Sequence, residues 1–564
     1  MLKKIFKKRK IKNTNLFVEP DEIFLDSKNL ENFDRQQFEG KIEKPISKKN
    51  VLFLGACLGI FMIIFSIRLG YLQIKKGEAY FIRSENNTLA KILIFADRGI
   101  IYDRNKEELA WNKKGEGYEL KRGYLSPGFS HILGYVSSPI KDKKGVYWQT
   151  EFEGKDGLEK QYSDRIQGIN GSKIVEIDAL GQIQYQNVIN APVRGEDLIT
   201  TIDSRIQSKL FTLIQELSEK NSFSGGAGII IDVTNGELLS LVSFPEYNSE
   251  ILSEGSDQEL INKYLTDKRK VFLDRTISGL YVPGSIIKPI LALGALKENI
   301  IDPNKEILSN GFISIPNPYV KDGETIFKDW KIHGYTAMRE AIAVSSDVYF
   351  YTIGGGFKDQ RGLGISNIEK YAKLFGIGEK TNIDLPDEKS GNIPSPIWKE
   401  KNFPGDPWRL GNTYHTAIGQ YGFQVTPIEM VRAISAIANN GTLITPHLLL
   451  ENTEDNKKVF ITDIKKEHYE IVKEGMREAV TYGTAVALNV PYINVAAKTG
   501  TAQLGVSKNR VNSWIVGFFP YENPKYAFTI MMESGPAQGG VGASSIMRQF
   551  LDWMSINTPE YFSL

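Results

Sequence analysis

The residues from Tyr281 to Ile290 read YVPGSIIKPI and carry the strongest local pattern in this chain of 564 residues. A Pro-Gly pair interrupts the preceding structure, and the apolar sequence that follows predicts a helix beginning near Ser285. Ser285 and Lys288 are three positions apart, so both side chains lie on one face of that helix. Pro289 is acceptable because the N–H groups of a first helical turn have no partner within the helix. The pattern therefore brings a hydroxyl and an amine together where a helix begins.

This pair of residue types indicates nucleophilic chemistry. A serine hydroxyl is a weak nucleophile until a base takes its proton, and a lysine whose pKa is lowered by apolar surroundings and other cations can be that base. Such a pair needs no histidine, and the chain has only five. The S-x-x-K spacing alone is a weak signal, because it recurs at Ser138 and Lys141. The lysine-rich sequence after this second copy has no apolar helical face, which predicts an exposed loop.

Two further polar clusters lie downstream. In AIAVSSDVYFY, Ser345 and Asp347 sit among apolar and aromatic residues, so this cluster is either a network at a groove or a helix cap. In AAKTGTAQ, a Lys-Thr-Gly triplet begins at Lys498 on a sequence typical of a strand. At a sheet edge, the small residues there would let a substrate backbone pair with the strand, and Thr499 could bind a carboxylate.

The chain from residue 197 onward predicts one large α+β domain. Apolar residues at helical spacing indicate a helix at Ser204–Lys220, and two β-rich runs joined by Thr234–Asn235–Gly236 indicate a hairpin with a tight turn. Three further strands and a closing helix are expected at residues 494–503, 512–519, 526–533 and 544–555. An antiparallel sheet would then join the two ends of the domain and leave the helical middle as a separate lobe, with a groove between them.

An uncharged apolar run of 17 residues, 51–67, follows a basic segment in which residues 1–50 hold 13 Lys and Arg against 8 Asp and Glu. As a helix the run covers about 25 Å, slightly less than a hydrocarbon core, and apolar residues up to Ile74 extend it. We therefore expect a cytoplasmic basic tail at 1–50, a single transmembrane helix at 51–74 and the remaining chain outside the cytoplasm. The alternatives are a cleaved signal peptide and a buried core helix.

Residues 75–196 predict small β-rich modules, with a short helix at Gly157–Gly168, and form a stalk or docking surface in this interpretation.

The whole chain has 69 Lys and Arg against 67 Asp and Glu, which disfavours a nucleic-acid binder. Its one cysteine excludes an intramolecular disulfide framework and a Cys-rich zinc site. Asp329 and His333 are four apart, and a structural hydrogen bond is favoured there over a metal site. No cofactor or metal is expected.

Together the three elements, in the order S-x-x-K, S-x-D and K-T-G, resemble the penicillin-recognising serine transpeptidases and serine β-lactamases. The stretches RLGYLQIKKGEAY, RGIIYDRN, GLEKQY, TIDSRIQ, AIGQYGFQVTP and KTGTAQ are similar to class B penicillin-binding proteins, from about residue 68 to the end. The resemblance implies an α+β transpeptidase domain at 197–564, with an antiparallel sheet flanked by helices and a helical lobe. It also implies an extracytoplasmic pedestal or dimerisation-type domain at 75–196.

The resemblance assigns roles to the residues of the three elements. The implied nucleophile is Ser285, and its general base is Lys288. Ser345 would shuttle a proton to the leaving amine, and Lys498 would set the local electric field and help to hold the carboxylate. The implied substrate-binding residues are Asp347, Thr499, Gly500 and Thr501. The backbone N–H groups of Ser285 and Thr501 would form the oxyanion hole. The implied reaction is D,D-transpeptidation of peptidoglycan stem peptides through a serine acyl-enzyme, with D,D-carboxypeptidase activity as a possible side reaction and covalent binding of β-lactams.

Asp347 departs from the asparagine of most relatives. A carboxylate only accepts hydrogen bonds, so a contact to a substrate carbonyl must be rearranged or mediated by Lys498. This aspartate, together with Trp330 and His333, resembles the penicillin-binding protein 2 group, which acts in side-wall elongation and cell shape. The expected partners are therefore stem peptides, β-lactams and a multi-span peptidoglycan glycosyltransferase at the cytoplasmic membrane. The alternatives are a septal transpeptidase, a membrane-tethered β-lactamase, a β-lactam sensor and an inactive scaffold.

Overall fold

The computed structural model describes residues 48–562 apart from 79, 81–87, 115–119, 143–146, 178–182, 318–319, 452–457, 506 and 538–539. The expected basic tail up to residue 47 lies outside the described residues. The chain divides into two compact units, one of residues 1–90 with 176–185 and one of residues 91–175 with 186–564. The second unit holds all three motifs.

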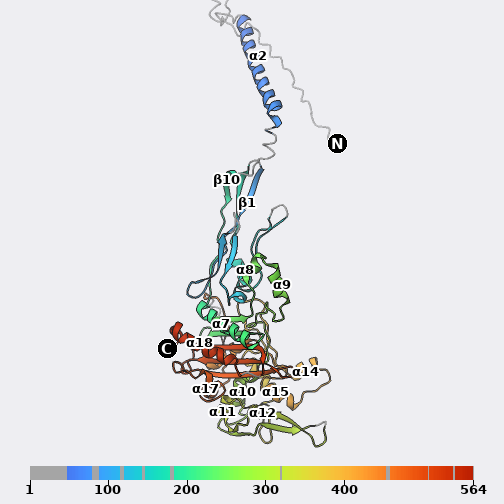
Figure 1. Ribbon diagram of the computed structural model, residues 1–564, viewed down its shortest axis with the longest axis vertical. Helices are drawn as coiled ribbons and strands as arrows, with labels where there is room; N and C mark the ends of the chain where they lie inside the picture. The colour runs from blue at the N-terminus through green and yellow to red at the C-terminus, as the bar shows by residue number, and fades with distance from the viewer. Residues whose placement is uncertain are drawn as a thin grey trace, which may run out of the picture. The chain divides into compact units, whose positions relative to one another are not determined.

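The first unit contains one long apolar helix, α2 (Lys48–Gly70), followed by the π-helical turn η1 (Tyr71–Lys75) (Figure 1). None of the residues of α2 is buried, and Lys48–Lys75 is long and apolar enough to cross a membrane. The helix expected at 51–74 is thus present and begins three residues earlier.

The N-terminal part of the chain after this helix is β-rich, as expected. One sheet has the strand order β11-β2-β3-β4, with bounds Leu198–Ile199, Ile101–Tyr102, Glu108–Lys114 and Leu120–Tyr124. Another has the order β1-β9-β10, with bounds Thr88–Ile94, Gly171–Ile177 and Ile183–Asn190. Two small pairs, β5-β8 and β6-β7, comprise Val136–Ser137 with Glu153–Gly154 and Ile140–Lys141 with Tyr147–Gln149. The second S-x-x-K copy therefore ends in strand β6, whose two residues are exposed and pair with β7. Most of the lysine-rich sequence predicted as a loop, residues 143–145, lies outside the described residues.

Three short helices accompany these strands. They are α4 (Ser130–Leu133), α5 (Gly157–Gln161) and α6 (Ser163–Ile166), so the single helix predicted at Gly157–Gly168 is divided at Tyr162. Glu159 on α5 is fully buried between two arginines, with Arg98 Nε 2.6 Å from its Oε2 and Arg122 Nε 2.7 Å from its Oε1. Burial alone would raise the pKa of Glu159, but the two guanidinium groups lower it below its usual value.

The transpeptidase-like part of the second unit is built on a five-stranded antiparallel sheet of order β13-β12-β22-β21-β20. In that order the strands are Leu238–Phe244, Gly225–Asp232, Tyr526–Pro536, Arg510–Phe519 and Ala496–Leu504. Helices α7 (Ser204–Asn221) and α18 (Ala543–Asn557) pack together against the sheet (Figure 1). The sheet therefore joins the two ends of the domain, which confirms the expected α+β architecture.

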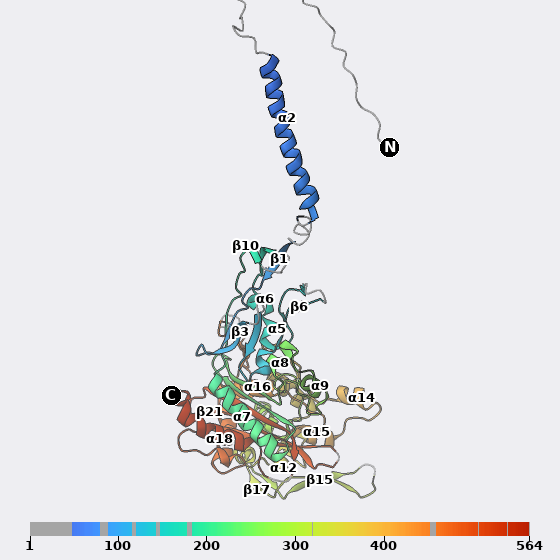
Figure 2. The same cartoon turned by 45° about the horizontal axis from the view of Figure 1, so that its top comes forward.

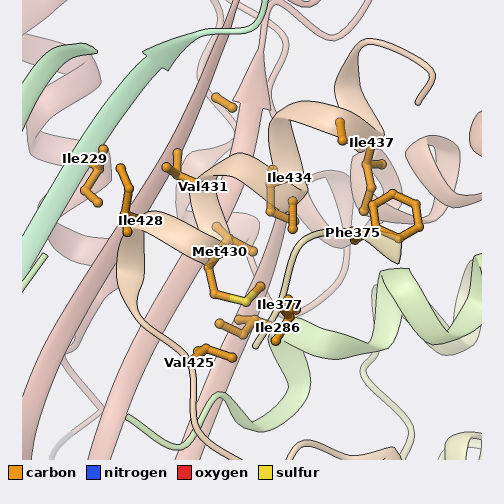
Figure 3. Packing of buried hydrophobic residues seen from close by; sticks show 14 of the residues in the cluster. Ile229, Ile286, Phe375, Ile377, Val425, Ile428, Met430, Val431, Ile434 and Ile437 are labelled. Atoms are coloured by element: carbon orange, nitrogen blue, oxygen red, sulfur yellow. The ribbon is translucent and has the colours of Figure 1, made fainter. Parts of the chain in front are cut away.

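A second group of helices covers the opposite face of the sheet. Figure 3 shows α16 (Pro427–Ala438) between the sheet and the helical lobe, where Ile428 and Val431 lie near Ile229 of β12. Thr426 caps this helix: its hydroxyl accepts a hydrogen bond from Glu429 N, and its own backbone N donates to Glu429 Oε2. Besides α16, the described α-helices between β13 and β20 in the chain are α8 (Ser249–Glu254), which packs on β4 and β5, α9 (Gln258–Thr266), α10 (Lys288–Lys297), α11 (Met338–Ala343), α12 (Asp347–Gly355), α13 (Ile365–Leu374), α14 (Pro396–Asn402), α15 (Leu410–Ala417) and α17 (Lys466–Thr481).

The hairpin of β12 and β13 is confirmed, but the tight turn predicted for it is wrong. Five residues, 233–237, separate the strands, and only Gly236 of the expected Thr-Asn-Gly turn has a positive φ, of 87°. The wider loop is stabilised by Asp232, whose Oδ1 accepts hydrogen bonds from the backbone N and hydroxyl of Thr234. Side-chain acceptors thus replace the backbone geometry of a two-residue turn.

Short strand pairs lie beside α12 (Figure 2). They are β14-β17, of Ile307–Ser309 and Gly334–Thr336, and β15-β16, of Phe312–Pro316 and Glu324–Lys328. A last pair, β18-β19, joins Thr442–Ile444 to Lys458–Phe460. The segment between β16 and β17 carries Asp329, Trp330 and His333 next to the start of α12.

Candidate active site

The candidate nucleophile lies on the one-turn 3-10 helix η2 (Gly284–Ile287), which continues directly into α10. Gly284 has a φ of 60°, a conformation that glycine adopts without the strain of a side chain. Ser285 is half-buried, whereas Lys288 is fully buried. The helix predicted from Ser285 onward is therefore present, with a tighter first turn.

The Lys288 ammonium group contacts the second motif. Its Nζ donates to Ser345 O at 2.9 Å, to Ser345 Oγ at 3.2 Å and to Asp347 Oδ1 at 2.6 Å. It also lies 5.2 Å from the centre of the Phe350 ring. An ammonium group has three N–H donors, so these three acceptors match its capacity. To accept a proton from Ser285, Lys288 must act as a neutral amine and give up one of these contacts.

The second motif combines the two interpretations that its sequence allows. Ser346 is the N-cap of α12 and accepts a hydrogen bond from Tyr349 N at 3.3 Å. Ser345 and Asp347, on either side of it, instead face Lys288. The capping residue and the residues at the site are thus different members of one tripeptide.

The third motif lies on β20, which is an edge strand of the sheet, as predicted. Lys498 is fully buried, and Thr499 Oγ1 donates to Thr484 Oγ1 at 2.7 Å. Gly500 lies so close to the nucleophile turn that a Cβ there would be 2.9 Å from Pro283 O. Thr501, the residue after Gly500, is exposed. The strand and the turn that carries Ser285 therefore pack directly together.

Burial sets the charge state of Lys498. Removal from water lowers its pKa well below the usual value, the positive charge of Lys288 lowers it further, and Asp347 partly opposes this. The partner of Asp347 is Lys288, at 2.6 Å. The site thus holds one ion pair beside a lysine that is biased towards its neutral form.

Asp329 and His333 lie close together, but the hydrogen bond that the sequence favoured is not formed, because the buried His333 Nε2 has no hydrogen-bond partner in the described part of the chain. His333 Nε2 lies 3.4 Å from Asp329 Oδ1, and both side chains are almost completely buried. Among the residues that the structure describes, no group of three His, Cys, Asp or Glu side chains could hold a metal ion.

Three site residues were missed in the sequence. Trp514 on β21 donates from Nε1 to Val282 O at 3.1 Å and so fixes the chain just before the nucleophile. Phe350 lies one helical turn after Asp347, and its spacing could have indicated the contact with Lys288. Thr484 gave no signal, because its contact with Thr499 depends on the fold of α17 against β20.

Comparisons with known proteins agree with this geometry. The family model of the penicillin-binding protein transpeptidase domain matches residues 226–552, and that of the penicillin-binding protein dimerisation domain matches residues 117–200. The peptidoglycan D,D-transpeptidase MrdA of Escherichia coli K12 is 30% identical over 474 residues, which cover 78% of this chain and 71% of that protein.

Two solved structures are also similar. The Helicobacter pylori penicillin-binding protein PBP2, in complex with MreC, is 29% identical with a TM-score of 0.67, over 83% of this chain and 99% of that one. Pseudomonas aeruginosa PBP2, in complex with WCK 5153, is 27% identical with a TM-score of 0.69, over 83% of this chain and 98% of that one.

The fold and the matched domains define a transpeptidase with a penicillin-binding architecture. The chain belongs to the penicillin-binding protein family, and it carries both the transpeptidase and the dimerisation domain of that family. The family and the enzyme class expected from the three motifs are thereby confirmed.

Proposed function

We propose that this chain is a membrane-anchored peptidoglycan D,D-transpeptidase that crosslinks stem peptides during side-wall elongation. The observation that carries the proposal is the convergence of the three motifs. Lys288 contacts Ser345 and Asp347, and the turn that carries Ser285 packs against the strand that carries Lys498 and Thr499. The names of the MrdA and PBP2 relatives support the elongation role.

In the proposed reaction, Ser285 Oγ attacks the carbonyl of the penultimate D-alanine and Lys288, as a neutral amine, takes the hydroxyl proton. The peptide bond breaks, Ser345 passes a proton to the leaving amine, and the terminal D-alanine departs. Backbone N–H groups of Ser285 and Thr501 stabilise the oxyanion, an effect typically worth a few kcal/mol. An amine of a neighbouring strand then attacks the ester, which forms the crosslink and restores the serine.

We propose that three of the four residues indicated as substrate-binding keep that role. Thr499 and Thr501, on an edge strand, bind the substrate carboxylate, and Gly500 permits the close approach of the strand. Asp347 accepts from Lys288, so its role is to hold the base.

The proposed domain organisation is a basic cytoplasmic tail at 1–50, a membrane span at 51–74, a pedestal at 75–196 and a transpeptidase domain at 197–564. The basic N-terminal segment before α2 supports an N-terminus in the cytoplasm and a catalytic domain outside the cytoplasmic membrane. The structure of a PBP2 relative with MreC supports an assembly with elongation proteins, and the proposed polymerising partner is a multi-span glycosyltransferase.

The test supplies the purified full chain with nascent glycan strands made from a lipid-linked pentapeptide precursor. Mass spectrometry then measures crosslinked muropeptides and released D-alanine. We expect crosslinks with the wild type and with Ser138→Ala, which alters the other S-x-x-K copy, and none with Ser285→Ala. Crosslinks formed by Ser285→Ala would contradict the proposed nucleophile. Rapid turnover of a penicillin adduct would instead favour a β-lactamase, and a folded chain without any adduct would favour a scaffold.

A further inference from the structure

The backbone of the second motif is strained at the residue that faces the base. Ser345 has a φ of 59°, in the left-handed region that non-glycine residues rarely adopt. Such a conformation is strained and persists only when the surroundings hold it. Ser345 is the middle residue of the three-residue connection between α11 and α12, so neither helix fixes it alone.

Asp329 holds the residues that follow Ser345. Its side chain is 0% exposed, and its Oδ2 accepts from Ser346 Oγ at 2.9 Å, from Val348 N at 2.9 Å and from Ser309 Oγ at 3.1 Å. Two of these donors lie at the N-terminus of α12, one from its N-cap Ser346 and one from its first turn, where a negative charge is also favoured by the helix dipole. One buried carboxylate thus joins β14 to the start of α12.

Trp330, the next residue, holds Ser345 itself. Its Nε1 donates to Ser345 O at 3.3 Å, and the same carbonyl accepts from Lys288 Nζ at 2.9 Å. The Trp330 residue is nevertheless 59% exposed. A side chain that is mostly in water contributes little to the hydrophobic core. Core packing therefore does not account for the position of Trp330, whereas its hydrogen bond to Ser345 O does.

We propose that Asp329 and Trp330 are positioning residues for acylation, which together hold Ser345–Asp347 in the strained conformation that presents its acceptors to Lys288. Asp329 fixes the start of α12 and Trp330 fixes the Ser345 carbonyl. The two neighbours therefore restrain consecutive parts of the same motif. This inference rests on the proposed function, because it assigns Lys288 and Ser345 to the reaction.

The test measures penicillin acylation of the full chain in detergent, separating the dissociation constant of the initial complex from the acylation rate constant, alongside the thermal midpoint. Trp330→Phe removes the N–H donor and keeps an aromatic ring. We expect its acylation rate constant to fall about fivefold, as for the loss of one hydrogen bond, with the midpoint within about 2 °C of the wild type. Asp329→Asn should reduce the rate constant by about fiftyfold, because a charged acceptor of several bonds is lost.

Matched controls lie on the same small strands. Tyr335→Phe alters an exposed aromatic residue on β17, and Asp322→Asn alters a carboxylate in the turn between β15 and β16; both should acylate like the wild type. If Trp330→Phe acylates within twofold of the wild type, or loses rate only in proportion to its unfolded fraction, the positioning role is overturned. Trp330→Phe alone decides this if Asp329→Asn does not fold. A wild type that is not acylated at all would instead contradict the proposed function.

Discussion

Replacing Gly500 with alanine tests whether the close approach of β20 to the nucleophile turn is needed for acylation. An added Cβ would lie 2.9 Å from Pro283 O and 2.8 Å from Ile286 Cγ2, whereas ordinary contacts begin near 3.4 Å. The Ile286 side chain can rotate, but Pro283 O belongs to the main chain, so the strand must withdraw by about 0.5 Å. A misplacement of about 1 Å can lower a reaction rate by a factor of roughly 100. Because the displacement here is about half as large, we expect the acylation rate to fall about tenfold.

The assay is the second-order rate constant for a fluorescent penicillin, measured with the thermal midpoint of the same preparation. Overpacking of this kind also destabilises by about 1–3 kcal/mol, so the rate is compared on folded protein. Gly405→Ala is the control, because nothing lies within 4 Å of its Cβ, although its φ of 78°, unlike that of Gly500, is itself unfavourable for alanine. A wild-type acylation rate in folded Gly500→Ala would refute the reasoning that strand and turn must meet this closely.

Three further predictions concern charged groups. Lys288→Arg should lower acylation about a thousandfold in the same assay, because a guanidinium does not give up its proton; a mild loss would contradict its role as base. In Asp347→Asn the pKa of Lys498 should fall further, because the negative charge of Asp347 raises that pKa in the wild type. Acylation that depends on the protonated fraction of Lys498 should therefore decline at a lower pH than in the wild type, and an unchanged pH profile would contradict this. Glu159→Gln should cost about 3–5 kcal/mol in denaturant unfolding, because two buried guanidinium groups lose their counter-charge. In the wild type, the pKa of Glu159 is depressed on folding, so its contribution is full above pH about 4.5 and lost as pH falls through the lower folded value. That loss in acid should be absent from the variant.

The sequence predicted those parts of the fold whose signal is local. Apolar residues at helical spacing located α7, and strand-like runs located β20, β21 and β22, because one face of each element packs on the core. The sequence also predicted that the sheet joins the two ends of the domain, but it did not predict the order of the strands. The hairpin turn was mispredicted, because Asp232 stabilises a five-residue loop through side-chain hydrogen bonds that the Asn-Gly pattern does not report.

The candidate site was predictable where short motifs carry it and unpredictable where distant segments meet. The three motifs gave the residue types, but the pairing of Lys288 with Asp347 depends on how α10 and α12 pack. Likewise, Arg98 and Glu159 are 61 residues apart, and no spacing rule connects them. Contacts between distant segments can be found only in the folded chain, whereas the motifs can be identified from their local sequence and their order along the chain.

The most direct test of the account is the mass of the full chain after reaction with penicillin, followed by peptide mapping of the adduct. The account predicts one added penicillin per chain, carried by the peptide that contains Ser285, and none in Ser285→Ala. An adduct on any other peptide, or a folded wild-type chain that stays unmodified, would contradict it.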